Sequence, residues 1–243
     1  MIVMVLGMHR SGTSTFAGVL HMNHIVMGTY QNFWPRPMIE NPKGFYENYD
    51  FRLLNDKLLK FSGYDVRSYK HDIPKINLKE SIFKKMKILI HNSNHKYKNW
   101  GWKDPRTCLT ASHWISSLKS LNIDKDLKIV FIARKASSVA RSLKNRNDLP
   151  KSKGLLIWEK YTKSALDICE KYNYPVHYSS FEDLLSNPRD TCDKLFNFLG
   201  KEYDNSIVDK FIDESISKSG HGDNIKYTQD VQMLEDLIYS KID

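Results

Sequence analysis

Short apolar runs alternate along this chain with longer stretches in which apolar side chains recur every third or fourth residue. The runs are continuous and rich in β-branched or aromatic residues, as in strands that are buried on both faces of a sheet. They cover residues 2–6, 100–103, 128–133 and 175–179. The periodic stretches predict helices at about 13–22, 48–62, 78–95, 136–144, 154–173, 188–199, 204–214 and 229–240. Strands that alternate with helices predict an α/β fold, with a mostly parallel central sheet flanked by helices.

Length and composition narrow this picture only slightly. The 243 residues contain no repeat, low-complexity tract or obvious linker, so we expect a single domain over residues 1–243. A net charge of +9 favours anionic partners such as nucleotides, nucleic acid or acidic glycans, although many of the lysines fit a solvated surface equally well. A polar stretch at 144–153 is expected to be a loop.

The cysteines and the hydrophobic runs of the sequence indicate where in the cell the protein is expected. The three cysteines form no C-x-x-C pair, which favours a reducing environment. No run of 18 apolar residues occurs, and the apolar start lacks the basic region of a signal peptide. We therefore expect a cytoplasmic protein without a membrane span.

The first chemical motif follows the first predicted strand. Residues 7–14 read Gly-Met-His-Arg-Ser-Gly-Thr-Ser, the G-x-x-x-x-G frame of a P-loop. Small residues there let successive backbone N–H groups converge on phosphate oxygens, and the helix N-terminus adds its positive dipole end. A tight turn without a ligand is the alternative. The pattern indicates a P-loop-type three-layer fold, in which the phosphate would be held by His9, Arg10, Ser11, Gly12, Thr13 and Ser14.

This loop differs from that of a nucleoside triphosphatase. Thr13 stands where such enzymes have lysine, and the cation comes earlier, at Arg10. The strand at 128–133 leads into Arg134 rather than into an aspartate that could hold magnesium. No metal is therefore expected, and a kinase or ATPase is disfavoured.

A second anion site is predicted at the end of the strand at 128–133. Arg134 follows this strand, and Ser142 lies eight residues later in the next helix. A strand-end guanidinium can bind phosphate oxygens in a bidentate manner, and a hydroxyl can add a neutral donor. Taken alone, Arg134 would equally fit a surface ion pair and Ser142 an ordinary helix position.

Together these motifs resemble the PAPS-dependent sulfotransferase family, and most closely its bacterial and tyrosylprotein-type branches. Residues 7–14 resemble the family's 5′-phosphosulfate loop in its arginine-containing form, and Arg134 with Ser142 matches its 3′-phosphate pair. The similarity covers roughly residues 1–200. The other segments that resemble the family are Asn41-Pro-Lys-Gly-Phe-Tyr-Glu47, Trp102-Lys-Asp-Pro-Arg106, Phe181-Glu-Asp-Leu-Leu-Ser-Asn-Pro188 and Leu195-Phe-Asn-Phe-Leu-Gly200.

The resemblance implies an activity and roles for particular residues. It implies transfer of a sulfuryl group from PAPS to a hydroxyl or amine, which leaves adenosine 3′,5′-bisphosphate. A glutamate base is implied between the phosphate loop and the Lys-Asp-Pro motif at residues 103–105, and Glu47 is the first candidate and Glu40 the second. Arg10 and Lys103 would stabilise the charge that develops on the transferred and leaving groups. A segment around Ser217–His221, including Lys218, would close over the nucleotide.

Several alternatives stay open at the level of the sequence. A histidine base (His9, His71 or His113) would also fit, since cytosolic members of the family use one. The acceptor would be a small molecule, a carbohydrate or a protein hydroxyl, and Tyr30, Phe33 and Trp34 would fit either an acceptor pocket or the core. A P-loop kinase and a non-catalytic binder of anionic glycan or nucleic acid are the other hypotheses; with a PAPS donor, no nucleic-acid partner is expected.

Overall fold

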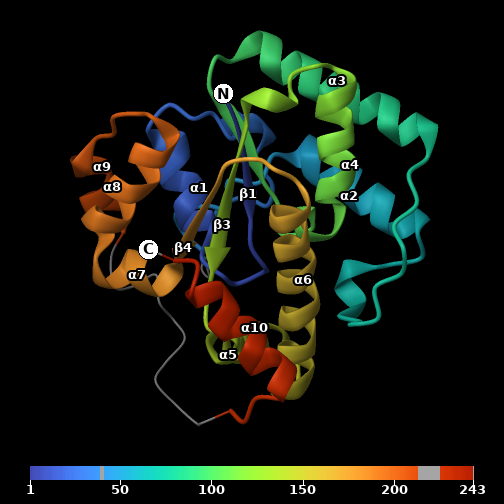
Figure 1. The fold of residues 1–243 in the computed structure, drawn as a ribbon, viewed down its shortest axis with the longest axis vertical. Coiled ribbons are helices and arrows are strands. Elements are labelled where there is room, and N and C mark those ends of the chain that lie inside the picture. Colours follow the sequence, from blue (N-terminus) through green and yellow to red (C-terminus); the bar gives the residue numbers. More distant parts are fainter. Residues whose placement is uncertain (39–40, 213–224, 243) are drawn as a thin grey trace.

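Four parallel strands form one sheet in the order β2-β1-β3-β4 (Figure 1). The strands are β1 (Ile2–Leu6), β2 (Trp100–Lys103), β3 (Leu127–Ala133) and β4 (Val176–Ser180). The computed structural model describes residues 1–38, 41–212 and 225–242. All strands run in the same direction, and β1 is paired on both sides, so it lies at the centre with every residue buried. The predicted parallel α/β fold is confirmed.

Helices cover both faces of the sheet, as the alternation of strands and helices requires (Figure 1). Val3 and Val5 of β1 point into the core formed with one group of helices, and Ile2, Met4 and Leu6 into the core on the opposite face. The first group contains α1 (Thr13–Met22), α7 (Phe181–Ser186), α8 (Pro188–Leu199) and α9 (Asn205–Phe211). The other face packs against α2 (Tyr49–Phe61), α3 (Glu80–Lys96), α4 (Thr107–Ser120), α5 (Ala136–Asn147), α6 (Lys151–Lys171) and α10 (Gln229–Tyr239).

Two helices are absent from the sequence-based prediction. The longer one, α4, carries several Ser and Thr residues and is buried on most of its surface, so it shows neither strong helix propensity nor a clear polar face. The shorter one, α7, begins immediately after β4 and is capped by Ser180, whose Oγ accepts a hydrogen bond from the Asp183 amide at 2.9 Å.

The expected loop at 144–153 is mostly helical, which corrects the prediction. Helix α5 continues to Asn147, and α6 already begins at Lys151. The polar side chains of this stretch lie on exposed helix surface, and only three residues connect the two helices.

The three cysteines are buried and carry free thiols. The cytoplasmic location inferred from them stays a prediction. No helix within the described part of the chain has both the length and the apolar character needed to cross a membrane.

Candidate active site

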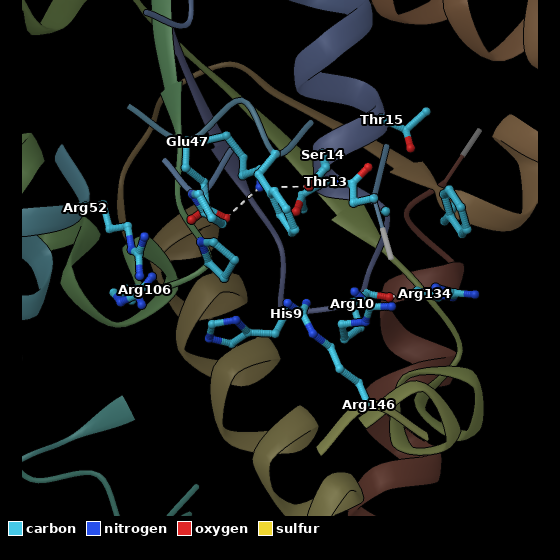
Figure 2. Close-up of a pocket in the computed structure, with 17 residues that line it drawn as sticks. His9, Arg10, Thr13, Ser14, Thr15, Glu47, Arg52, Arg106, Arg134 and Arg146 are labelled. Atoms are coloured by element: carbon cyan, nitrogen blue, oxygen red, sulfur yellow. Dashed lines mark hydrogen bonds and ion pairs between the residues drawn. The ribbon is translucent and has the colours of Figure 1, made fainter. Parts of the chain in front are cut away.

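One cavity opens where the carboxyl ends of β1, β2 and β3 meet (Figure 2). This is the edge of a parallel sheet at which α/β proteins bind ligands. Its volume is about 200 Å³. Among the described residues that line it, six are cationic and one is a carboxylate: Arg10, Arg52, Lys103, Arg106, Arg134 and Arg146 against Glu47. The imbalance fits a polyanionic ligand.

The loop after β1 has the backbone that a phosphate cradle needs. Arg10 and Gly12 both adopt left-handed conformations, with φ values of 69° and 78°. A Cβ atom on Gly12 would lie 2.1 Å from Cδ2 of Phe181, so no side chain fits there. Helix α1 begins at the next residue, Thr13, and its N-terminus therefore points at the cavity.

The two anion sites expected from the sequence are in direct contact. Arg134 Nη1 donates to the backbone carbonyl of Arg10 at 2.7 Å, and Arg10 Nε donates to Ser142 Oγ at 2.8 Å. The Arg134 guanidinium also stacks 4.5 Å above the ring of Phe181. The end of β3 and the phosphate loop thus form one continuous wall of the cavity.

Arg134 is a buried cation beside the loop after β1. Only 8% of the residue is exposed. Burial and, more weakly, the nearby charge of Arg10 lower the pKa of Arg134 to about 10, against the opposing effect of Glu182. The group stays protonated at neutral pH, and a bound anion would relieve this cost.

Lys103 joins the phosphate loop to the predicted base. Its Nζ lies 2.9 Å from Glu47 Oε1 and donates to Ser14 Oγ at 3.1 Å. The lysine is 1% exposed and the glutamate 7%. Strand β2 places the lysine beside Val5 of β1, immediately before the loop. The backbone of Glu47 is fixed by Trp34, whose amide donates to the Glu47 carbonyl at 2.9 Å.

A buried polar network supports the turn that follows Lys103. Asp104 accepts from Arg106 Nη1 at 2.8 Å and from Asn55 Nδ2 at 2.7 Å. Burial by itself would lower the pKa of Arg106, but the charges of Asp104 and Asp56 outweigh it and raise this pKa. Asn55 on α2 also accepts from Trp114 Nε1 at 2.8 Å. The network ties α2 and α4 to the end of β2.

His9 is the one candidate histidine base that lines the cavity among the described lining residues. Removal from bulk water, together with the charge of Arg106, lowers the pKa of His9 to about 3. Its Nε2 is buried and has no hydrogen-bond partner in the described structure. An imidazole with this pKa is neutral at pH 7 and is a poor proton acceptor.

Most of the predicted site residues line the cavity. His9, Arg10, Gly12, Thr13, Ser14, Glu47, Lys103 and Arg134 line the cavity. Ser11 is a buried residue of the loop that does not line the cavity, and Ser142 contacts the cavity residue Arg10. Glu40 and Lys218 lie outside the described residues.

The aromatic residues that were candidates for an acceptor pocket do not line the cavity. Phe33 packs against His21 and Tyr46, with ring centroids 5.1 and 5.3 Å apart. Tyr30 and Trp34 are exposed at the surface, and only the adjacent Pro35 reaches the cavity among residues 30–36.

Three cations of the cavity have no role in the prediction from the sequence: Arg52, Arg106 and Arg146. Arg106 belongs to a quoted motif and could have been found there. Arg52 on α2 and Arg146 in the last turn of α5 resemble ordinary helix-surface cations, so nothing local distinguishes them. Only the packing of α2 and α5 around the sheet brings them to the site.

The fold and this site define an α/β protein of the P-loop type. The chain matches the sulfotransferase domain family over residues 2–233 and therefore belongs to that family. It is an enzyme of the sulfotransferase class. No curated protein sequence matches the chain significantly.

Two solved structures share the fold. One is the sulfotransferase domain of the olefin synthase from Synechococcus PCC 7002, with a TM-score of 0.56 and 15% identity over 98% of this chain and 94% of that one. The other is the sulfotransferase domain from the curacin biosynthetic pathway, with a TM-score of 0.59 and 13% identity over 100% and 98% of the two chains. At these identities the likeness concerns the fold alone.

Proposed function

We propose that this enzyme transfers a sulfuryl group from PAPS to a hydroxyl or amine acceptor. The proposal depends on two hydrogen bonds that share Arg10. Arg134 donates to the Arg10 carbonyl, and the Arg10 side chain donates to Ser142. The first contact places a P-loop and a strand-end arginine on one wall of a single cavity. A nucleotide with a phosphate at each end of its ribose suits such a pair of anion sites.

The donor would be held by two groups of residues. His9 to Ser14 would surround the 5′-phosphosulfate through backbone amides and hydroxyls, and Arg134 with Ser142 would bind the 3′-phosphate. Lys218 stays a candidate for a closing segment. When bound, the donor supplies an activated sulfuryl group. The excess of cations in the cavity supports this fit.

Glu47 is the proposed general base, and Glu40 remains the second candidate. Glu47 is a buried carboxylate in the cavity and lies next to Lys103, which itself contacts Ser14 of the loop. It would accept the proton of the acceptor hydroxyl. Lys103 and Arg10 would stabilise charge on the leaving phosphate oxygen and on the sulfuryl oxygens. The low pKa of His9 makes it a weaker candidate.

The kinase alternative lacks support in the described residues. Thr13 at the usual lysine position lines the cavity, and the carboxylate there, Glu47, is already paired with Lys103. No metal forms part of the proposal.

Calorimetry with adenosine 3′,5′-bisphosphate tests the donor assignment. We expect binding that is unaffected by EDTA and much tighter than binding of ATP with magnesium. Arg134→Gln should weaken it roughly tenfold to a hundredfold, because a charge-assisted bond contributes about 1.5–3 kcal/mol. Affinity for adenosine 5′-phosphate should change little.

The matched control is Arg67→Gln, since the Arg67 side chain is 80% exposed. It should leave both affinities unchanged. A preference for ATP with magnesium over adenosine 3′,5′-bisphosphate would contradict the proposal. Transfer of labelled sulfate from PAPS to a panel of phenols, sugars and amines then tests the reaction itself.

A further inference from the structure

Arg52 is a cavity cation that forms no ion pair with any residue in the part of the chain that the structure describes. It lies on the first turn of α2, and its side chain lines the cavity. Its Nε and Nη1 atoms are buried and have no hydrogen-bond partner among the described residues. Buried guanidinium N–H groups without acceptors are costly, so such groups are retained where a ligand supplies the missing acceptors.

The nearby carboxylates are already engaged by other cations. Asp56, one helical turn after Arg52, accepts from Arg106 Nε at 2.7 Å. Asp104 accepts from Arg106 Nη1 at 2.8 Å, and Glu47 from Lys103 at 2.9 Å. Arg106 and Lys103 are thus paired with carboxylates, whereas no carboxylate among residues 1–38, 41–212 and 225–242 forms an ion pair with Arg52.

The position of Arg52 separates it from the proposed donor site. In Figure 2, Arg52 and Arg106 lie at one end of the cavity, and Arg10 and Arg134 lie at the other. Glu47 lies on the side of Arg52. A group bound by Arg52 would therefore belong to the molecule whose hydroxyl faces Glu47, not to the nucleotide.

We infer that the acceptor carries an anionic group, a carboxylate or a phosphate, that Arg52 binds while the acceptor hydroxyl faces Glu47. The planar guanidinium has its N–H donors arranged to match two oxygens of such a group. This inference rests on the proposed function, because it takes the Glu47 end of the cavity as the acceptor end. It selects acidic hydroxyl compounds over neutral ones.

Matched acceptor pairs test the inference. One set contains 4-hydroxyphenylacetate, its methyl ester and 4-hydroxybenzyl phosphate; the other contains N-acetylglucosamine and its 6-phosphate. For the scaffold that reacts, kcat/KM for the anionic member should exceed that of the neutral member by roughly tenfold to a hundredfold. The carboxylate and phosphate members show which anion the site takes. Binding to the protein saturated with adenosine 3′,5′-bisphosphate, measured by calorimetry, should follow the same order.

Two variants identify Arg52 as the source of the preference. Arg52→Gln should reduce the anionic-to-neutral ratio towards one. Lys57→Gln removes a cation from the exposed side of the same helix and should keep the ratio. A merely structural Arg52 would instead lower the melting temperature of Arg52→Gln, whereas loss of an uncompensated buried charge should leave it unchanged or raised.

The outcomes separate this inference from the proposed function. If adenosine 3′,5′-bisphosphate does not bind, the proposed function fails. If it binds but acidic and neutral acceptors show equal binding and equal kcat/KM, or if Arg52→Gln keeps the preference, the inference about Arg52 is overturned while the donor assignment stands.

Discussion

The buried pair of Glu47 and Lys103 gives the sharpest prediction about this enzyme. Glu47→Gln removes the charge partner of a lysine that is 1% exposed and lies 2.9 Å away. Breaking such a pair on one side costs about 3–5 kcal/mol, and the remaining amide oxygen keeps a neutral hydrogen bond, so we expect a loss of about 3 kcal/mol. For a chain of this size each kcal/mol corresponds to roughly 2–4 °C, which predicts a melting temperature about 6–12 °C lower.

Differential scanning calorimetry measures this loss, and the surface pair of Glu80 and Lys84 provides the control. Its side chains are 70% and 67% exposed, and Glu80→Gln should cost less than about 1 kcal/mol. The double variant Glu47→Gln with Lys103→Met should recover part of the stability that the single glutamate variant loses, because no unpaired charge is then buried.

The turnover number of Glu47→Gln tests the proposed role of Glu47 as general base. Loss of a general base lowers kcat by about 10²–10⁴. Adenosine 3′,5′-bisphosphate should raise the melting temperature of Glu47→Gln at least as much as that of the wild type, since its phosphates would offer Lys103 a new partner. If Glu47→Gln unfolds at the wild-type temperature and retains full turnover, both the pair and the base assignment are refuted.

Three further changes probe the surroundings of the site. Gly12→Ala should abolish binding of adenosine 3′,5′-bisphosphate in calorimetry, because its Cβ would lie 2.1 Å from Phe181 at a φ of 78°. Asn55→Ala should cost more than about 2 kcal/mol in urea unfolding, since it leaves Asp104 and Trp114 with unmet buried hydrogen bonds. The lowered pKa of His9, about 3, means that the unfolded chain binds a proton between pH 6.5 and 3 that the folded chain does not. Stability should therefore fall with decreasing pH over that range by up to about 1.4 kcal/mol per unit, and His9→Asn should flatten the slope; equal slopes would contradict this assignment.

The local pattern of apolar and polar residues was sufficient to predict most of the helices and strands. The β-branched run at Ile2–Leu6 predicted a buried strand because continuous apolar character suits a strand covered on both faces. The start of α1 at Thr13 followed from the glycine before it. Helix α4 was not predicted, because burial of most of its surface leaves too small a polar face for a clear helical periodicity.

The amino-acid sequence alone indicated the alternation of strands and helices behind the parallel α/β fold, the candidate phosphate loop and the candidate pairing of Arg134 with Ser142, because each of these patterns lies in residues that are close together along the chain. Tertiary structure decided which distant charges share the cavity. Ser14 meets Lys103 only because β2 lies beside β1, and Glu47 and Arg52 reach the site only because α2 packs against the end of β2. The charge balance of a buried site depends on contacts between distant segments, and neither spacing nor composition records those contacts.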